Sequence, residues 1–177
     1  RERFTAVTSA RKVEGPLDLV QIDHTLVDVI VVDRVHRRPL QRPWLTLAID
    51  VATRMITGRY VTFDPPSVLS LSMCLEHSVK SKQVASASQA LLDWPAFGLP
   101  TRIHVDNGQD FRSKAFVNAC AEWGVQLSFR PPGRPHHGGH IERLIGTTMG
   151  AVHLLPGSTD SNPLRRGDYD SAAHASL

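Results

Sequence analysis

The sequence predicts an α/β domain with one mixed sheet of five strands and with helices on both of its faces. Two observations lead to this prediction. Three strand-like runs come first along the chain, and helical and strand-like patterns alternate after them. This order is typical of a mixed sheet whose two faces are covered by helices. A chain of 177 residues is long enough to build one such domain around its own core.

The first three strands are predicted from runs rich in Val, Ile and Leu. Residues 17–32 read "LDLVQIDHTLVDVIVV", which indicates a long strand with a bulge near His24 and Thr25. Residues 44–50 and 55–63 are shorter runs joined by a turn, so the three strands form an antiparallel meander. The following "DPPS" segment ends the meander and can cap a helix.

Helices and strands are predicted to alternate over the rest of the chain, because the spacing of apolar residues changes from two to three or four. The expected elements are helices over 68–80 and 86–94, a strand over 101–106, a helix over 113–123, a strand over 125–129 and a helix over 139–154. The last helix has one apolar stripe, made of Ile141, Leu144, Ile145, Met149 and Val152. The stripe leaves Glu142 on another face of the helix.

The domain itself is expected over residues 17–155. Residues 1–16 are interpreted as an N-terminal linker, and the polar residues 156–177 as a linker toward a further C-terminal domain. The chain starts at Arg1 and shows no signal peptide, so we interpret it as a piece of a longer protein. No apolar run reaches the roughly 18 residues that a membrane span needs, which argues against a membrane protein.

The composition favours an acidic partner and a reducing compartment. The formal net charge is +3, and arginines gather in two loops: Arg34, Arg37, Arg38 and Arg42 in one, and Arg130, Arg134 and Arg143 in the other. A solvated basic surface explains such clusters equally well. The two cysteines, Cys74 and Cys120, lie in apolar segments and are expected to be reduced core thiols. We therefore expect a location in the cytoplasm.

Four aspartates stand inside or at the end of apolar strands: Asp23, Asp28, Asp50 and Asp106. A carboxylate is costly to bury unless it is paired, hydrogen-bonded or bound to a metal. Asp106 is followed by Asn107 and Gly108, which can turn the chain sharply and leave the carboxylate at the carboxyl end of a strand. Any one such aspartate can equally be a strand-end residue that reaches water or caps a turn.

Four segments in series give the chain a resemblance to a known family. They are "QIDHT" with Asp23, "RPWLTLAIDVATRMITG" over 42–58, "VDNGQDFRS" with Asp106 and "GGHIERLIGT" with Glu142. Between Asp106 and Glu142 lie 35 residues. In these segments the chain resembles the catalytic cores of DDE transposases and retroviral-type integrases, most closely the large bacterial transposases similar to that of bacteriophage Mu. The resemblance covers residues 18–158 and implies an RNase H-like fold.

The resemblance also implies a function. It identifies Asp23, Asp106 and Glu142 as a catalytic triad that holds two Mg²⁺ or Mn²⁺ ions, and hard carboxylate oxygens suit such cations. The implied enzyme is a metal-dependent polynucleotidyl transferase of bacteria, which cuts DNA at transposon ends and joins the 3′-OH ends to target DNA by two-metal phosphoryl transfer. The implied partners are transposon-end and target DNA, further copies of the chain and a helper ATPase.

The basic residues around Glu142 are candidates for DNA contacts. They are Arg130, Arg134, His136, His137, His140 and Arg143, chosen by their charge and their proximity in sequence. A solvated basic loop is the alternative. His136 and His140 could also bind zinc, but the Cys or His partners that zinc needs are not nearby. Gly146 and Gly150 leave a track without side chains, which suits close approach by DNA or packing against a helix.

Two other functions remain open at this stage. The first is an RNase H-like nuclease that cuts DNA or RNA without joining strands. The second is a DNA-binding or assembly module whose catalytic role has lapsed, since a fold can outlive its site. The presence of all three carboxylates argues against the second alternative.

Overall fold

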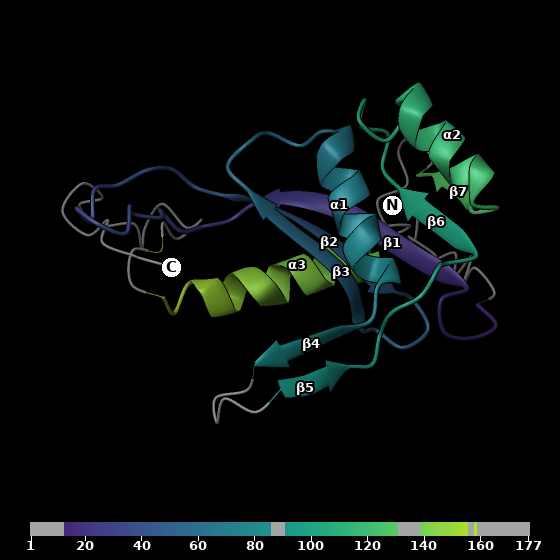
Figure 1. The fold of residues 1–177 in the computed structure, drawn as a ribbon, viewed down its shortest axis with the longest axis horizontal. Coiled ribbons are helices and arrows are strands. Elements are labelled where there is room, and N and C mark those ends of the chain that lie inside the picture. The colour runs from purple at the N-terminus through teal and green to yellow at the C-terminus, as the bar shows by residue number, and fades with distance from the viewer. Residues whose placement is uncertain (1–12, 86–90, 131–138, 156–157, 159–177) are drawn as a thin grey trace, which may run out of the picture.

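The computed structural model describes residues 13–85, 91–130, 139–155 and 158, and it is built around a five-stranded sheet in the order β3-β2-β1-β6-β7 (Figure 1). The strands are β1 (Leu19–Leu26), β2 (Trp44–Asp50), β3 (Ile56–Thr62), β6 (Arg102–Val105) and β7 (Gln126–Phe129). The first three pair antiparallel, whereas β6 pairs parallel to β1 and β7 parallel to β6. The predicted mixed sheet is confirmed.

Helices cover both faces of this sheet. Helices α1 (Val68–Val79) and α2 (Lys114–Glu122) pack on one face around a core that includes Val20 and Ile22 of β1. Helix α3 (Gly139–Val152) packs on the other face, where Ile141 and Met149 are buried against Leu47 of β2. Successive side chains of a strand alternate between the faces, so β2 serves both cores, with Ala48 on one face and Leu47 on the other. The predicted apolar stripe of the last helix is therefore confirmed.

The helix starts follow from local capping. Ser67, the last residue of "DPPS", accepts a hydrogen bond from the Ser70 N–H and caps α1 as predicted. Ser113 caps α2 in the same way through the Phe116 N–H. Phe116 and Cys120 of α2 are buried, whereas Val117 and Trp123 are exposed, so the helix buries a narrow face.

The helix predicted over 86–94 is wrong where the structure describes it. Strand β5 (Leu91–Trp94) pairs antiparallel with β4 (Lys82–Ala85), and residues 86–90 lie outside the described residues. In Figure 1 this two-stranded sheet lies apart from the central sheet. The Trp94 indole N–H donates to the Ile56 carbonyl at 2.7 Å, and the Lys82 ammonium lies 5.4 Å from the Trp94 ring centroid. These tertiary contacts outweigh the helical spacing of a nine-residue segment, which is too short to be a stable helix alone.

The first strand is shorter than predicted and has no bulge. Its pairing with β2 runs without interruption from Val20 opposite Asp50 to Leu26 opposite Trp44. The irregularity lies instead between β2 and β3, where the register shifts after Ala48 and Thr57 is the extra residue. Thr57 is fully buried and its hydroxyl donates to the Ala48 carbonyl at 3.4 Å, which stabilises the shift.

Cys74 and Cys120 are free and buried, as predicted. Burial raises the pKa of the Cys74 thiol to about 12 and that of the Cys120 thiol to about 11. In the described part of the chain, no helix has the length and apolar character needed to cross a membrane. The expected linkers over 1–16 and 156–177 lie almost entirely outside the described residues, so the domain limits stay a prediction.

Candidate active site

Asp23 and Asp106 are brought together by the parallel pairing of β1 and β6. In that pairing Val20 lies opposite Ile103 and Gln21 opposite His104. Two residues further along both strands come Asp23 and Asp106, the latter immediately after β6. The carboxyl ends of parallel strands meet at one edge of a sheet, and open α/β sheets place their ligands there. The predicted proximity of these two carboxylates is thus explained by strand register.

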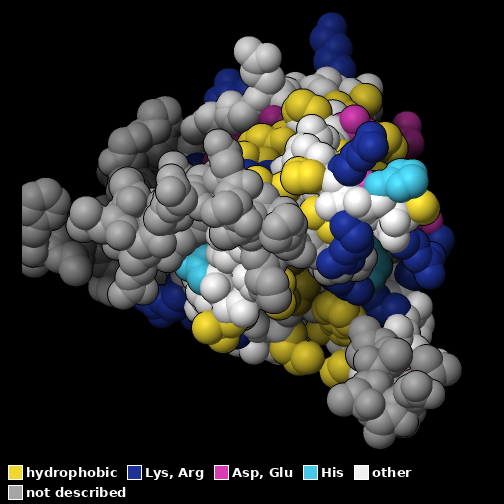
Figure 2. Space-filling model, turned by 90° about the vertical axis from the view of Figure 1, so that its left-hand side faces the viewer, with side chains coloured by type: hydrophobic (Ala, Val, Ile, Leu, Met, Phe, Trp, Pro, Cys, Tyr) yellow, Lys and Arg dark blue, Asp and Glu magenta, His cyan; other side chains and the backbone are white. Residues whose placement is uncertain are grey.

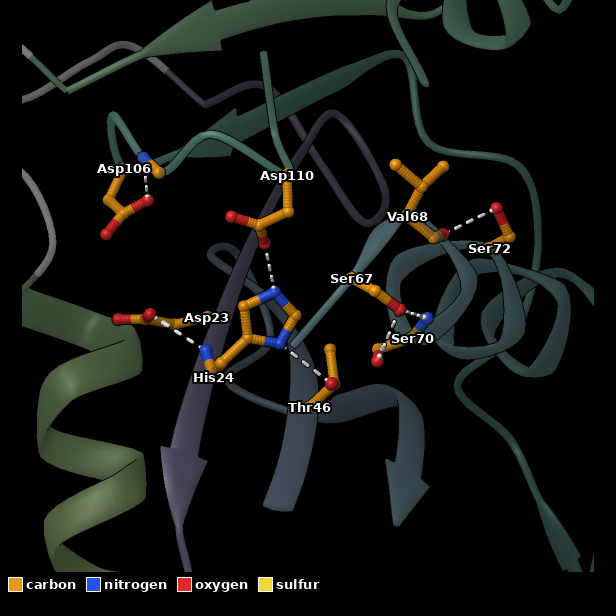
Figure 3. Close-up of polar contacts among 10 residues, drawn as sticks. Asp23, His24, Thr46, Ser67, Val68, Ser70, Ser72, Asp106 and Asp110 are labelled. Atoms are coloured by element: carbon orange, nitrogen blue, oxygen red, sulfur yellow. Dashed lines mark hydrogen bonds and ion pairs between the residues drawn. The ribbon is translucent and has the colours of Figure 1, made fainter. Parts of the chain in front are cut away.

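A backbone N–H orients each of the two carboxylates (Figure 3). The His24 N–H donates to Asp23 Oδ1 at 2.8 Å, and the Gly108 N–H donates to Asp106 Oδ1 at 2.7 Å. In Figure 3 both side chains project to the same side of the strands that carry them. One oxygen of each carboxylate is therefore fixed by the backbone, and the second oxygen can meet a cation.

Gly108 makes the turn after Asp106 possible because no side chain fits there. A Cβ atom at this position would lie 2.7 Å from Asp110 Oδ1 and 3.1 Å from Asp106 Oδ1. The "DNG" turn of the sequence thus brings the backbone close to two carboxylates. This close approach explains the glycine better than backbone dihedral freedom does.

The pKa of Asp23 is raised above the ordinary value. Burial is the largest cause, and the negative charge of Asp106 raises the pKa further. The His24 N–H bond and the positive charges of Arg130 and His24 lower the pKa and partly offset these effects. Two carboxylates that repel each other in a partly buried place form a site that favours a cation.

Glu142 reaches the same region from helix α3. The first turn of α3 is fixed on β1, because the Ile141 N–H donates to Gln21 Oε1 at 3.2 Å. Side chains two residues apart on a strand lie on the same face, so Asp23 faces the α3 side of the sheet as Gln21 does. The next residue of α3, Glu142, is half exposed and points to Arg130. The third carboxylate predicted for the site is therefore within the same neighbourhood.

Arg130 links two of the three carboxylates. Its Nη1 donates to Glu142 Oε1 at 2.7 Å, and its Nη2 lies 3.9 Å from Asp23 Oδ2. The backbone N–H of Arg130 donates to the Val105 carbonyl at 2.8 Å, which ties the residue to β6 just before Asp106. We refer to the three predicted carboxylates, Asp23, Asp106 and Glu142, as the carboxylate cluster. Arg130 was predicted to contact DNA, and the structure places its guanidinium group between Asp23 and Glu142 of this cluster.

The described residues contain no group of three or more His, Cys, Asp or Glu side chains arranged closely enough to hold a metal together. Asp23 and Asp106 fit a hard cation by their oxygen donors and mutual repulsion. Glu142 instead pairs with the guanidinium group of Arg130. The oxygen donors of Asp23 and Asp106 thus fit Mg²⁺ or Mn²⁺ chemically, whereas the carboxylate of Glu142 is held by Arg130.

The remaining predicted DNA contacts are only partly described. Three of them lie outside the described residues: Arg134, His136 and His137. His136 is also one of the two residues of the alternative zinc site. His140 is half-buried at the start of α3, and Arg143 is exposed one residue after Glu142. Gly146 and Gly150 are exposed, and nothing in the described structure lies within 4 Å of a Cβ built at either. Packing of these glycines against a helix of the described chain is excluded.

Sequence reasoning missed a buried network beside the site, centred on His24. The His24 Nε2 atom lies 2.8 Å from Asp110 Oδ2, and Nδ1 lies 2.8 Å from the Thr46 hydroxyl (Figure 3). The His24 ring also stacks on Phe111, with 5.0 Å between ring centroids. Asp110 does not cap the following helix, because Ser113 is the N-cap of α2. The sequence offered one indication of this network: His24 directly follows Asp23, and Asp110 stands four residues after Asp106.

The other two strand aspartates have structural roles. Asp50 accepts hydrogen bonds from the Leu17 N–H at 3.1 Å and from the Thr53 N–H at 3.0 Å, so it caps turns. Asp28 pairs with Arg42 and lies 3.2 Å from His153 Nε2 of the segment after α3. Neither belongs to the Asp23 and Asp106 pair. Leaving both outside the candidate site is consistent with these contacts.

Comparison with known proteins adds the evolutionary relationship. Residues 21–157 match the family model described as the TnsB C-terminal domain. The transposase for transposon Tn552 of Staphylococcus aureus is 29% identical over 153 residues, which is 86% of this chain and 30% of that protein. The transposon Tn7 transposition protein TnsB of Escherichia coli is 28% identical over 177 residues, with 96% of this chain and 25% of that protein covered. The chain therefore spans only about a third or less of these relatives.

A solved structure shows the same fold at lower sequence similarity. A chain of the simian T-cell lymphotropic virus intasome, solved in complex with the PP2A regulatory subunit B56 gamma, is 15% identical with a TM-score of 0.52. The match covers 90% of this chain and 55% of that chain. The predicted RNase H-like fold and the predicted resemblance to transposases and integrases are both confirmed.

Proposed function

The chain belongs to the TnsB C-terminal domain family, and on that premise we propose that it is the catalytic core of a DNA transposase. In this proposal the enzyme cuts DNA at transposon ends and joins the 3′-OH ends to target DNA. The observation that carries the proposal is the register of β1 and β6, which sets Asp23 beside Asp106 at one edge of the sheet. The transposase relatives support the same function.

Asp23, Asp106 and Glu142 would hold Mg²⁺ or Mn²⁺, with two ions in each site. When bound, such ions activate an oxygen nucleophile and neutralise the charge that develops on the leaving oxygen. The His24 and Gly108 N–H groups keep one oxygen of each aspartate in place, so the free oxygens need little reorganisation. Arg130 lies beside Asp23 and Glu142, where its guanidinium group would also be placed to donate to a DNA phosphate.

The proposal involves direct attack on the phosphodiester and no covalent bond between protein and DNA. Arg130 partly neutralises Asp23 and Glu142, which limits the free-energy cost of like charges at one place. The proposed partners are transposon-end DNA, target DNA and further copies of the chain, with a helper ATPase as an additional candidate. We also propose that the protein acts in the bacterial cytoplasm, which is consistent with its bacterial relatives.

The test of this function uses Asp106→Asn, because this change removes a carboxylate charge and keeps the side-chain size. Reversal of strand joining on a branched DNA substrate in Mn²⁺ requires no recognition of transposon ends, so it suits this chain. We expect the wild type to reseal the branched strand weakly and the variant to show no product above background. Asp64→Asn, in the turn after β3, is the control, since the hydrogen bonds described for Asp64 are with Thr62, away from Asp23 and Asp106.

Two outcomes would overturn the proposal in different ways. Equal resealing by wild type and Asp106→Asn would show that the carboxylate is not catalytic. Cutting of the branched substrate without any joining would instead indicate a nuclease of the same fold. In the full-length transposase, we expect both cutting at the transposon end and joining to be lost with Asp106→Asn while DNA binding is kept.

A further inference from the structure

The segment between β1 and β2, residues 27–43, forms an arm that extends from the sheet (Figure 1). Its two limbs are joined by backbone hydrogen bonds, including Val27 N–H to the Pro43 carbonyl at 2.8 Å and Leu40 N–H to the Val31 carbonyl at 2.8 Å. Val32 and Pro39 also form a β-bridge. The arm is therefore an ordered two-limbed structure and not an unstructured loop.

Asp33 closes the tip of the arm. Its carboxylate accepts hydrogen bonds from the backbone N–H groups of Val35 at 3.0 Å, His36 at 2.6 Å and Arg38 at 2.6 Å. These bonds, led by that from His36, hold the pKa of Asp33 below its ordinary value, so the carboxylate stays ionised and bound to the backbone. The hydrogen bonds of this carboxylate are thus made with the backbone of the turn, and the positive charge of Arg37 is the smallest of the causes that lower its pKa.

The arginines of the arm divide into two kinds. Arg42, at the base, donates to the Val27 carbonyl at 2.9 Å and to the Leu26 carbonyl at 3.3 Å, and it pairs with Asp28. The tip arginines are exposed, and within the described residues no hydrogen bond or ion pair occupies their guanidinium groups: Arg34, Arg37 and Arg38. The base arginine is thus structural, whereas the three tip arginines remain available.

The base of the arm is fastened to helix α3. Asp28 lies 3.2 Å from His153 Nε2, just beyond the end of α3, and Val29 forms a β-bridge with Ser158. Val27 and Val29 are buried in the same core cluster as Met149 of α3. The arm and the helix that carries Glu142 are therefore packed as one unit. A ligand bound at the tip is held at a fixed position relative to the candidate active site.

We propose that the tip of this arm binds the phosphate backbone of double-stranded DNA through Arg34, Arg37 and Arg38. The proposal rests on the proposed function, which supplies DNA as the partner. The tip projects beyond the end of β1, the strand that carries Asp23, so the contact lies outside the carboxylate cluster. Figure 2 looks onto this end of the molecule and shows Lys and Arg side chains (dark blue) gathered around His on its right-hand part.

Phosphate contact explains the composition of the tip better than solubility alone. Three guanidinium groups to which the described part of the chain offers no hydrogen bond or ion pair lie within five residues, and Val35, which is 77% exposed, stands among them. Guanidinium groups bind phosphate oxygens through paired N–H donors, and each neutralised phosphate releases condensed counterions. Binding through the tip is therefore predicted to be strongly dependent on salt and independent of base sequence.

The experiment measures binding of a fluorescent DNA duplex by anisotropy across a series of salt concentrations. The tip variant combines Arg34→Gln, Arg37→Asn and Arg38→Gln; asparagine is chosen at 37 because that residue has φ of 58°. The control variant combines Arg54→Asn, Arg59→Gln and Lys80→Gln, three exposed basic residues away from the arm. Each variant removes three positive charges from a formal net charge of +3, so total charge is matched.

We expect the slope of log K against log salt to become shallower by about 2 to 3 in the tip variant, since each phosphate contact contributes about 0.9. The control variant should keep the wild-type slope. A third variant with lysine at 34, 37 and 38 keeps the charges, so it should retain the salt slope and lose part of the affinity. Thermal unfolding of all variants confirms that each is folded.

Equal slopes for the tip and control variants would overturn the proposal. A second result would also overturn it: the tip variant binds DNA as the wild type does but no longer sediments with vesicles of phosphatidylcholine and phosphatidylserine. The tip would then recognise anionic lipid and not DNA. Resealing of the branched substrate by wild type, but not by Asp106→Asn, establishes the proposed function whatever the arm does. Failure of the arm and failure of the catalytic core are thus distinguished by separate measurements.

Discussion

Arg130 and Glu142 form an ion pair of 2.7 Å that joins the end of β7 to helix α3 inside the carboxylate cluster. The same guanidinium group lies 3.9 Å from Asp23. Arg130 therefore supplies a positive charge to two of the three predicted carboxylates, Asp23 and Glu142. A divalent cation that binds Asp23, Asp106 and Glu142 must compete with Arg130 for Glu142.

The first prediction is that Arg130→Gln tightens the binding of Mn²⁺ in the absence of DNA. Removal of a fixed positive charge close to a cation site lowers the electrostatic cost of binding, and about 1 kcal/mol corresponds to roughly fivefold in affinity. Electron paramagnetic resonance of free Mn²⁺ measures the dissociation constant. Arg59→Gln is the matched control, since Arg59 lies on β3, an edge strand that β2 separates from β1. Unchanged or weaker Mn²⁺ binding in Arg130→Gln would contradict the competition.

A second prediction concerns Asp23→Asn in metal-free protein. Because the folded-state pKa of Asp23 lies above the ordinary value of 3.8, the carboxyl favours folding only while it is protonated, and this favourable contribution is lost as pH rises through the folded pKa. Asparagine stays neutral and can still accept from the His24 N–H. We expect the variant to be more stable than wild type at neutral pH.

The advantage of Asp23→Asn should disappear below pH 3.8, where the carboxyl is protonated in both the folded and the unfolded chain. Chemical unfolding in chelator at several pH values measures the difference. Asp18→Asn is a useful contrast, because the pKa of Asp18 is lowered by the Glu14 N–H and by Arg102, so that variant should be no more stable at neutral pH. A stability gain for Asp23→Asn that is the same at all pH values would contradict the assignment.

A third prediction is that His24 and Asp110 act together in holding the "DNGQDF" turn against β1. Their hydrogen bond of 2.8 Å is part-buried and crosses from β1 to the loop that carries Asp106. We expect His24→Ala and Asp110→Ala each to destabilise the fold, with a coupling free energy of about 1 to 2 kcal/mol in a double-mutant cycle. Denaturant unfolding of the wild type, both single variants and the double variant measures it.

Activity separates positioning from simple stability in this pair. Asp110→Asn keeps an acceptor for His24 and should restore most of the stability and resealing activity that Asp110→Ala loses. A coupling free energy near zero, or full activity in Asp110→Ala, would show that the bond does not position Asp106. Thr46→Val is the control, because it removes the 2.8 Å hydrogen bond at Nδ1 of the His24 ring and leaves the bond between Nε2 and Asp110 in place.

The elements that the sequence predicted correctly are those with a long pattern and local caps. The stripe of α3, the Ser67 cap and the three antiparallel strands each depend on residues close together in the chain. The segment 91–94 was misassigned because its partners, Lys82 and the Ile56 carbonyl, belong to other elements. Long-range contacts of this kind leave no periodic pattern in the segment itself.

The same distinction applies to the candidate site. Asp23, Asp106 and Glu142 could be proposed because each stands in a recognisable segment at a known spacing. The pairing of Arg130 with Glu142 and that of His24 with Asp110 could not, because they depend on strand register and side-chain direction. The arm shows the same limit, because its four arginines look alike in sequence. Among the described contacts, Arg42 is bound by Asp28 and two backbone carbonyls, whereas the guanidinium groups of the other three are not.

The last prediction compares two glycines that look equivalent in sequence. A Cβ atom at Gly58 would lie 2.4 Å from the Cys74 carbonyl oxygen and 2.9 Å from the Ser78 Cβ, so β3 packs directly against the α1 backbone there. Gly58→Ala should therefore destabilise the fold by about 1 to 3 kcal/mol, as overpacking does. In the described structure nothing lies within 4 Å of a Cβ atom at Gly146 of α3, so Gly146→Ala should stabilise the helix by up to about 1 kcal/mol. Thermal unfolding measures both changes. A Gly58→Ala variant as stable as the wild type would contradict the close approach of β3 and α1. A Gly146→Ala variant less stable than the wild type would show that this face of α3 is covered in solution.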